Sequence, residues 1–228
     1  MALAGISGTT IEASVTHRIE QAIFDVAQAL EVPVLILALA ALAAVLFELG
    51  AFGVELRTRR RRHFPTLEAT AAHARVAVEE DDRTLAKSEL AGVAWSAAMA
   101  QTLDTIGETA GTAGADTRLA KALADFDFDS ERRLARTRLL VRGGPALGLM
   151  GTLIPLSPAL DGLARGHVDQ LSQNLRVAFS VTVLGLLVGA IAFGISLYRD
   201  RMYGQDLSDL EYVAAVLTDR TPDRARVR

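Results

Sequence analysis

The sequence predicts an all-α integral membrane protein with three transmembrane helices and a helical cytoplasmic insert between the first and second of them. Half of the 228 residues are apolar and only 5% are aromatic. Alanine, the strongest helix former, supplies much of the apolar share. Three apolar stretches approach or exceed the roughly 20 residues that a helix needs to cross a membrane, and arginines gather beside each of them.

The first predicted span covers residues 32–56, and the only charge in its apolar run up to Val54 is Glu48. An ionised carboxylate is costly in a bilayer, so we expect Glu48 to snorkel or to pair with an arginine of the neighbouring cluster, with a proton-relay role as the alternative. Residues 1–31 are predicted to form an extracytoplasmic amphipathic helix, which either lies on the outer membrane surface or continues the first span. Its apolar positions recur every three or four residues, at Ile11, Val15, Ile19, Ile23, Val26 and Leu30.

The second and third predicted spans cover residues 139–163 and 177–198. The third carries no charge and is the clearest span in the chain. The second has about 18 charge-free residues between Arg142 and Asp161, and it contains three prolines that should bend it, Pro145, Pro155 and Pro158. Asp161 lies at the outer mouth of this span, where it either attracts cations or ends the helix in the headgroup region.

Arginine clusters orient the spans, because basic residues next to a span stay on the cytoplasmic side. This places the chain in the plasma membrane as a multi-pass protein with its amino terminus outside and its carboxyl terminus inside. Residues 57–138 then form a cytoplasmic helical region, 164–176 an outer loop and 199–228 a cytoplasmic tail. Since the clusters lie next to the spans, we expect them to contact the lipid bilayer, and we expect no binding to nucleic acid. The clusters are Arg57 with Arg59 to Arg62; Arg132, Arg133, Arg136, Arg138 and Arg142; and Arg199 with Arg201.

The cytoplasmic region is predicted to hold two or three helices, broken near Asp81 and Asp82 and again around residues 107–114. Asp129 or Ser130 is read as a helix cap. We expect these helices to stack on the inward extensions of the spans, with little core of their own. The chain has no cysteine, and its four histidines lack metal-ligand spacing, so we expect no metal, no cofactor and no enzymatic activity.

The last two spans each carry a stripe of small residues with one threonine in it. A polar side chain in hydrocarbon faces a neighbouring helix or an aqueous cavity, so Thr152 and Thr182 are the candidate ion-pathway residues. The alternative is that each hydroxyl only bonds a carbonyl of its own helix within a packing seam. The residues predicted to set helix packing and pore shape are Gly148, Gly151, Pro155, Gly185 and Gly189.

These stripes resemble the signatures of the MotA/TolQ/ExbB proton-channel family. The second span reads Pro-Ala-Leu-Gly-Leu-Met-Gly-Thr over residues 145–152, and the third reads Thr-Val-Leu-Gly-Leu over residues 182–186. The layout is similar too, with three spans and a large insert after the first. The chain looks like a divergent member, because Ile191 replaces the proline of the family's third span and Pro155 and Pro158 are additional.

The resemblance implies a subunit of a proton or sodium channel motor that converts ion motive force into mechanical work or transport across the cell envelope. It also implies a homo-oligomer, a pentamer, around a single-span partner of the ExbD/TolR/MotB type that carries a membrane aspartate. Thr152 and Thr182 would then line the ion path beside that carboxylate. The alternative is a membrane scaffold or interaction protein whose glycine and threonine stripes only pack helices.

Overall fold

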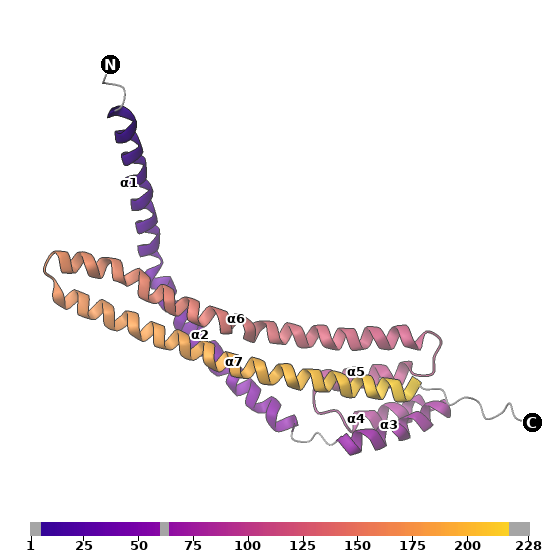
Figure 1. Cartoon of the computed structure of the whole chain (residues 1–228). Coiled ribbons are helices and arrows are strands. Elements are labelled where there is room, and N and C mark those ends of the chain that lie inside the picture. The colour runs from indigo at the N-terminus through magenta and orange to yellow at the C-terminus, as the bar shows by residue number, and fades with distance from the viewer. Residues whose placement is uncertain (1–5, 60–63, 219–228) are drawn as a thin grey trace, which may run out of the picture. The chain divides into compact units, whose positions relative to one another are not determined.

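The computed structural model describes residues 6–59 and 64–218, with side chains from Thr16 onward. This part of the chain is all helical, which confirms the predicted all-α class (Figure 1). Three helical segments are long and apolar enough to cross a membrane: Thr16–Arg59, Ala115–Ala164 and Val168–Thr218. The helices are α1 (Ile6–Ala29), α2 (Glu31–Arg59), α3 (Phe64–Glu79), α4 (Arg83–Ala91), α5 (Ala97–Thr109), α6 (Ala115–Ala164) and α7 (Val168–Thr218).

A single residue, Leu30, separates α1 from α2. Pro33 lies in the first turn of α2, and a proline ring clashes with the carbonyl four residues before it, here that of Ala29. The helix is therefore interrupted at Leu30, although the membrane-length segment Thr16–Arg59 runs through this point. The location of residues 1–31 on the outer membrane surface stays a prediction. In its predicted apolar stripe, the side chains of Ile11 and Val15 lie outside the described residues.

The chain divides into two compact units, and the first comprises Met1–Phe47 and Leu139–Ala192. In this unit α6 and α7 are joined by a turn of three residues, 165–167. The amide of His167 donates to the Gly162 oxygen at 2.8 Å and that of Gly166 to the Leu163 oxygen at 2.9 Å, the pattern that closes a helix with a left-handed residue. Gly166 has φ +81, a conformation that favours glycine. The turn between α6 and α7 is therefore shorter than the loop predicted over residues 164–176, because α7 is helical from Val168.

Helix α6 continues through all three of its prolines, Pro145, Pro155 and Pro158. The predicted cap at Asp129 or Ser130 is wrong, since both residues lie in the interior of this helix. Serine and aspartate also occur within helices, where tertiary packing overrides their preference for caps, and Ser130 is buried by such packing.

The second unit comprises Glu48–Arg138 and Phe193–Arg228, and it holds α3, α4 and α5. The two predicted helix breaks are present, between α3 and α4 and between α5 and α6. A further break at residues 92–96 was not predicted, and there Ser96 caps α5 by accepting a hydrogen bond from the Met99 amide. Arg60 to Arg62, which belong to the first basic cluster, lie outside the described residues.

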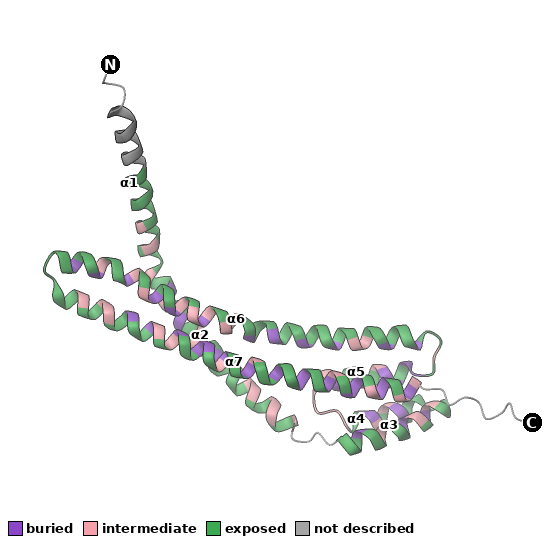
Figure 2. Cartoon of the chain, viewed as in Figure 1, coloured by how far each residue is buried: buried purple, intermediate pink, exposed green. Residues whose placement is uncertain are grey.

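The largest apolar core of the described residues lies in this second unit (Figure 2). The sequence predicted that the helices of the insert would have little core of their own. In the structure α3 to α5 share this core with α6 and α7. Their fully buried residues include Leu67, Leu90, Leu103 and Ile106 from α3 to α5, and Leu210 and Val213 from α7.

Candidate functional site

The small-residue stripes of α6 and α7 face each other within the first unit. A Cβ atom added to Gly144 would lie 2.7 Å from the Gly185 carbonyl oxygen, and one added to Gly148 would lie 3.3 Å from the Thr182 Cα. Because real Cβ atoms essentially never approach within 3.0 Å, the two backbones are in direct contact here. Glycine is needed at this crossing because any side chain would keep the backbones of α6 and α7 apart.

The contact extends in both directions along the two helices. A Cβ at Gly189 would meet the Pro145 ring at 2.8 Å, and one at Gly151 would meet the Cβ of Val181 at 2.9 Å. The residues predicted to shape the packing, namely Gly148, Gly151, Pro155, Gly185 and Gly189, are all buried in the structure.

The two threonines in this seam are bonded differently. The Thr182 hydroxyl lies 3.2 Å from the carbonyl oxygen of Gly148 on α6 and 3.2 Å from that of Ala178 on its own helix. The Thr152 hydroxyl donates only to the Leu149 oxygen of its own helix, at 2.8 Å. A hydroxyl has one proton and two lone pairs, so both oxygens keep their acceptor capacity. Both side chains are half-buried.

A buried charge cluster lies in the second unit, where Glu48 of α2 meets Arg199 of α7. The Arg199 Nη1 atom lies 2.5 Å from the Glu48 carboxylate, and the Arg199 Nε atom lies 2.9 Å from that of Glu55. The hydroxyl of Thr137 on α6 accepts from the same Nη1 at 3.0 Å, and the hydroxyl of Tyr203 donates to Glu55 at 3.1 Å. Three helices are thereby held together by one guanidinium group.

The sequence pointed to pairing for Glu48 but to the wrong arginine. Its partner is Arg199 of α7 rather than a member of the cluster that follows α2. Glu55 was not recognised as a member of the site at all. A signal was present, because Glu48 and Glu55 are seven residues apart and therefore share one face of α2. Two carboxylates on one face at the end of an apolar helix indicate that a neighbouring helix supplies a cation.

Asp161, the other predicted accessory charge, stands apart from these groups. It is exposed in the last turn of α6, three residues before the helix ends at Ala164. In the described part of the chain Asp161 makes no ion pair, and its role as a cation attractor stays a prediction.

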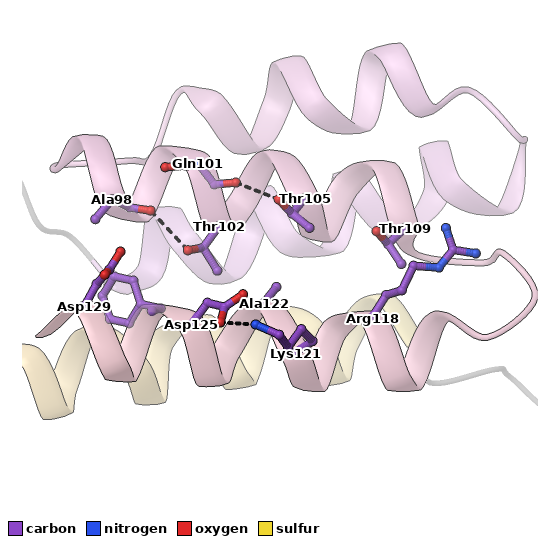
Figure 3. Close-up of a pocket in the computed structure, with 11 residues that line it drawn as sticks. Ala98, Gln101, Thr102, Thr105, Thr109, Arg118, Lys121, Ala122, Asp125 and Asp129 are labelled. Carbon is purple, nitrogen blue, oxygen red and sulfur yellow. Dashed lines mark hydrogen bonds and ion pairs between the residues drawn. The ribbon is translucent and has the colours of Figure 1, made fainter. Parts of the chain in front are cut away.

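A polar hollow of about 290 Å³ lies between α5 and α6 (Figure 3). The Thr102 and Thr105 hydroxyls at its rim donate to carbonyls of their own helix, at 3.1 and 3.0 Å. Lys121 pairs with Asp125, one turn further along α6. These groups satisfy one another without a ligand. Across the described ranges, no three histidine, aspartate or glutamate side chains gather as metal ligands do.

Comparison with known proteins finds a family match for the part of the chain that contains the contact between α6 and α7. The sequence profile of the MotA/TolQ/ExbB proton channel family matches residues 94–203. The match includes α5 and both threonine-bearing stripes, and it confirms the resemblance seen in the sequence. No curated protein matches the chain.

Proposed function

We propose, given that residues 94–203 belong to the MotA/TolQ/ExbB proton channel family, that the chain is one subunit of a channel motor. It would convert a proton or sodium motive force into mechanical work or transport across the cell envelope, together with a single-span partner. The observation that supports this most directly is the contact of Thr182 with Gly148. It places a half-buried hydroxyl within a family-matched seam between two membrane-length helices.

The geometry of the hydroxyls suits the wall of an ion path. Thr182 donates its proton to a backbone carbonyl, and Thr152 does the same within its helix. Each oxygen can therefore accept a hydrogen bond from a protonated carboxyl group or a water, or contribute to the coordination of a cation that is losing its hydration shell. Neither hydroxyl titrates, so the threonines would guide the ion without storing it.

The group that binds the ion is proposed to come from the partner. Residues 144–160 and 177–198 contain no acidic side chain, so the chain supplies no carboxylate at the centre of these two spans. A membrane aspartate on a single-span partner would fill this role, enclosed by a homopentamer of the chain. Exposed apolar side chains on the span helices are available for lipid and for neighbouring subunits, among them Leu149, Leu153, Phe179, Val183 and Leu186.

The proposed orientation keeps the amino terminus outside and the carboxyl terminus in the cytoplasm. It rests on the arginine clusters of the sequence and on the positive-inside rule. In this orientation the charge cluster lies at the cytoplasmic ends of the first and third spans, and α3 to α5 with the apolar core of the second unit are cytoplasmic.

A scaffold is the second candidate, and one observation favours it. Thr152 bonds only to its own helix, and the glycine stripes of α6 and α7 pack against each other within one chain. A protein whose stripes served only for packing would look the same in this region.

Proton flux in liposomes separates the two functions. The chain is purified with the single-span protein that co-purifies with it, and a pH-sensitive dye reports flux driven by a potassium diffusion potential. The motor subunit is expected to conduct with the partner and to conduct poorly alone. A partner carrying Asp→Asn at its membrane aspartate provides the matched control. Equal flux with and without the partner, or no co-purifying single-span protein, would count against the motor.

A further inference from the structure

A small cavity lies in the second unit, where α2, α6, α7 and the segment before α5 converge. Its volume is about 70 Å³, and its lining includes Arg59, Trp95, Ser130 and Met202. One water molecule needs roughly 10–15 Å³ by this kind of measure. The cavity therefore has room for several water molecules.

Arg59, one of the lining residues, has a buried donor with no acceptor among the residues that the structure describes. The Arg59 side chain is 10% exposed, and its Nη2 atom lies 2.9 Å from an Asp206 carboxylate oxygen. Its Nη1 atom is fully buried and makes no hydrogen bond to any described residue. Leaving a buried charged donor unpaired is more costly than leaving a neutral one unpaired, so a small polar occupant at this atom is strongly favoured.

The charges around the cavity select water over an anion. The lining carries three carboxylates, of Glu55, Asp129 and Asp206, against the guanidinium groups of Arg59 and Arg133. An anion would meet a net negative surrounding. A water molecule can accept from Arg59 and donate to a carboxylate at the same time.

We infer that this cavity binds a cluster of ordered water molecules that bridges Arg59 to the neighbouring carboxylates and hydrates Glu55. Glu55 joins the cavity to the buried charge cluster, because its two oxygens accept from Tyr203 at 3.1 Å and from Arg199 at 2.9 Å. A carboxylate offers about four acceptor sites, so two sites remain for water. Hydration of Glu55 lowers the cost of burying Arg199, and it gives this carboxylate a route for proton exchange with solvent. The inference stands independently of the proposed channel function.

Hydroxyl-radical footprinting of the full-length chain in detergent tests this occupancy. Microsecond X-ray pulses generate radicals from bound water as well as from bulk water, and mass spectrometry then locates the oxidised side chains. Met202 lines the cavity and is 6% exposed, whereas Met99 lies in the apolar core and is 0% exposed. Met202 is expected to be oxidised several-fold faster than Met99. Equal rates would overturn the inference.

Two variants show whether the labelling comes from the cavity or from bulk solvent. Ser130→Leu places an apolar side chain in the cavity, and it is expected to reduce Met202 oxidation to near the Met99 rate. Ser130→Ala leaves the space open and should preserve the difference. If Met99 oxidation rises in the leucine variant, the fold has opened, and Ala98→Val then provides the same test with a smaller side chain. Unchanged Met202 oxidation in a folded, filled variant would refute bound water as the source.

Discussion

The Nη1 atom of Arg199 lies 2.5 Å from the carboxylate of Glu48, a residue 151 positions earlier in the chain. Arg199 is only 4% exposed and reaches Glu55 and Thr137 as well. A single side chain on α7 thus bonds to α2 and α6 at the end of the predicted first span. The cluster holds three helices of the second unit together, so removing it should lower the free energy of unfolding of the chain.

Replacing Arg199 by methionine should destabilise the protein by about 2–4 kcal/mol. The substitution keeps side-chain bulk but leaves two carboxylates without their cation, and breaking a buried pair typically costs about 3–5 kcal/mol. We expect a loss near or below the lower end of that range, because Glu48 and Glu55 are 19% and 31% exposed. Denaturant unfolding in detergent measures the change.

The control for Arg199 is Arg201→Met, since Arg201 is exposed and its loss should change stability by less than about 0.5 kcal/mol. Glu48→Gln added to Arg199→Met should recover part of the loss by removing one of the unpaired charges. Equal stabilities of the two arginine variants would show that the cluster contributes nothing.

Gly185→Ala should disrupt the crossing of α6 and α7. Its Cβ atom would lie 2.8 Å from the Gly148 Cα and nearer still to the Gly144 carbonyl oxygen. These contacts are with backbone, which cannot rotate away, so we expect a loss of about 1–3 kcal/mol. Gly194→Ala on the same helix is the control, because nothing lies within 4 Å of its added atom. That variant should be neutral or more stable by up to about 1 kcal/mol, in line with helix propensity.

Thr182→Val should reduce partner-dependent proton flux at least about tenfold, equivalent to roughly 1.4 kcal/mol. Valine keeps the volume but removes the hydroxyl that contacts the Gly148 oxygen. Thr182→Ser retains the hydroxyl and should preserve most of the flux, while thermal stability in detergent reports packing separately. Full flux in a valine variant that assembles normally would exclude Thr182 from the path.

Two adjacent aspartates should respond differently to substitution. Asp82 caps α4 by accepting a hydrogen bond from the Leu85 amide at 3.0 Å, so Asp82→Ala should cost about 1 kcal/mol. Asp81 has φ 61, a left-handed conformation that glycine adopts without strain. Asp81→Gly should therefore be neutral or stabilising by up to about 1 kcal/mol, since strain of this kind costs about 1–2 kcal/mol. Denaturant unfolding compares the two variants, and loss of stability in both would contradict the assigned conformations.

Local features of the sequence sufficed for the helical class and for the faces of the helices. Apolar length predicted the three membrane-length segments, and the spacing of Gly148, Thr152, Gly185 and Gly189 predicted two small-residue faces. Breaks between helices were predictable where a left-handed residue or a glycine-rich turn interrupts the chain, as at Asp81 and residues 107–114. The break before Ser96 was missed because it depends on how α4 and α5 pack in the core.

The sequence by itself therefore determined the properties that depend on residues close together in the chain. These are the positions of the helices, the hydropathy of each segment and the side chains that share a helix face. Only the tertiary structure decided which faces meet, because contacts between distant residues depend on how helices cross. It placed the Thr182 hydroxyl against Gly148, chose Arg199 rather than a nearby arginine for Glu48, and joined Glu55 to the same cluster. Opposite charges attract whatever their separation in sequence, so the partner of a buried carboxylate is known only when the helices have been brought together.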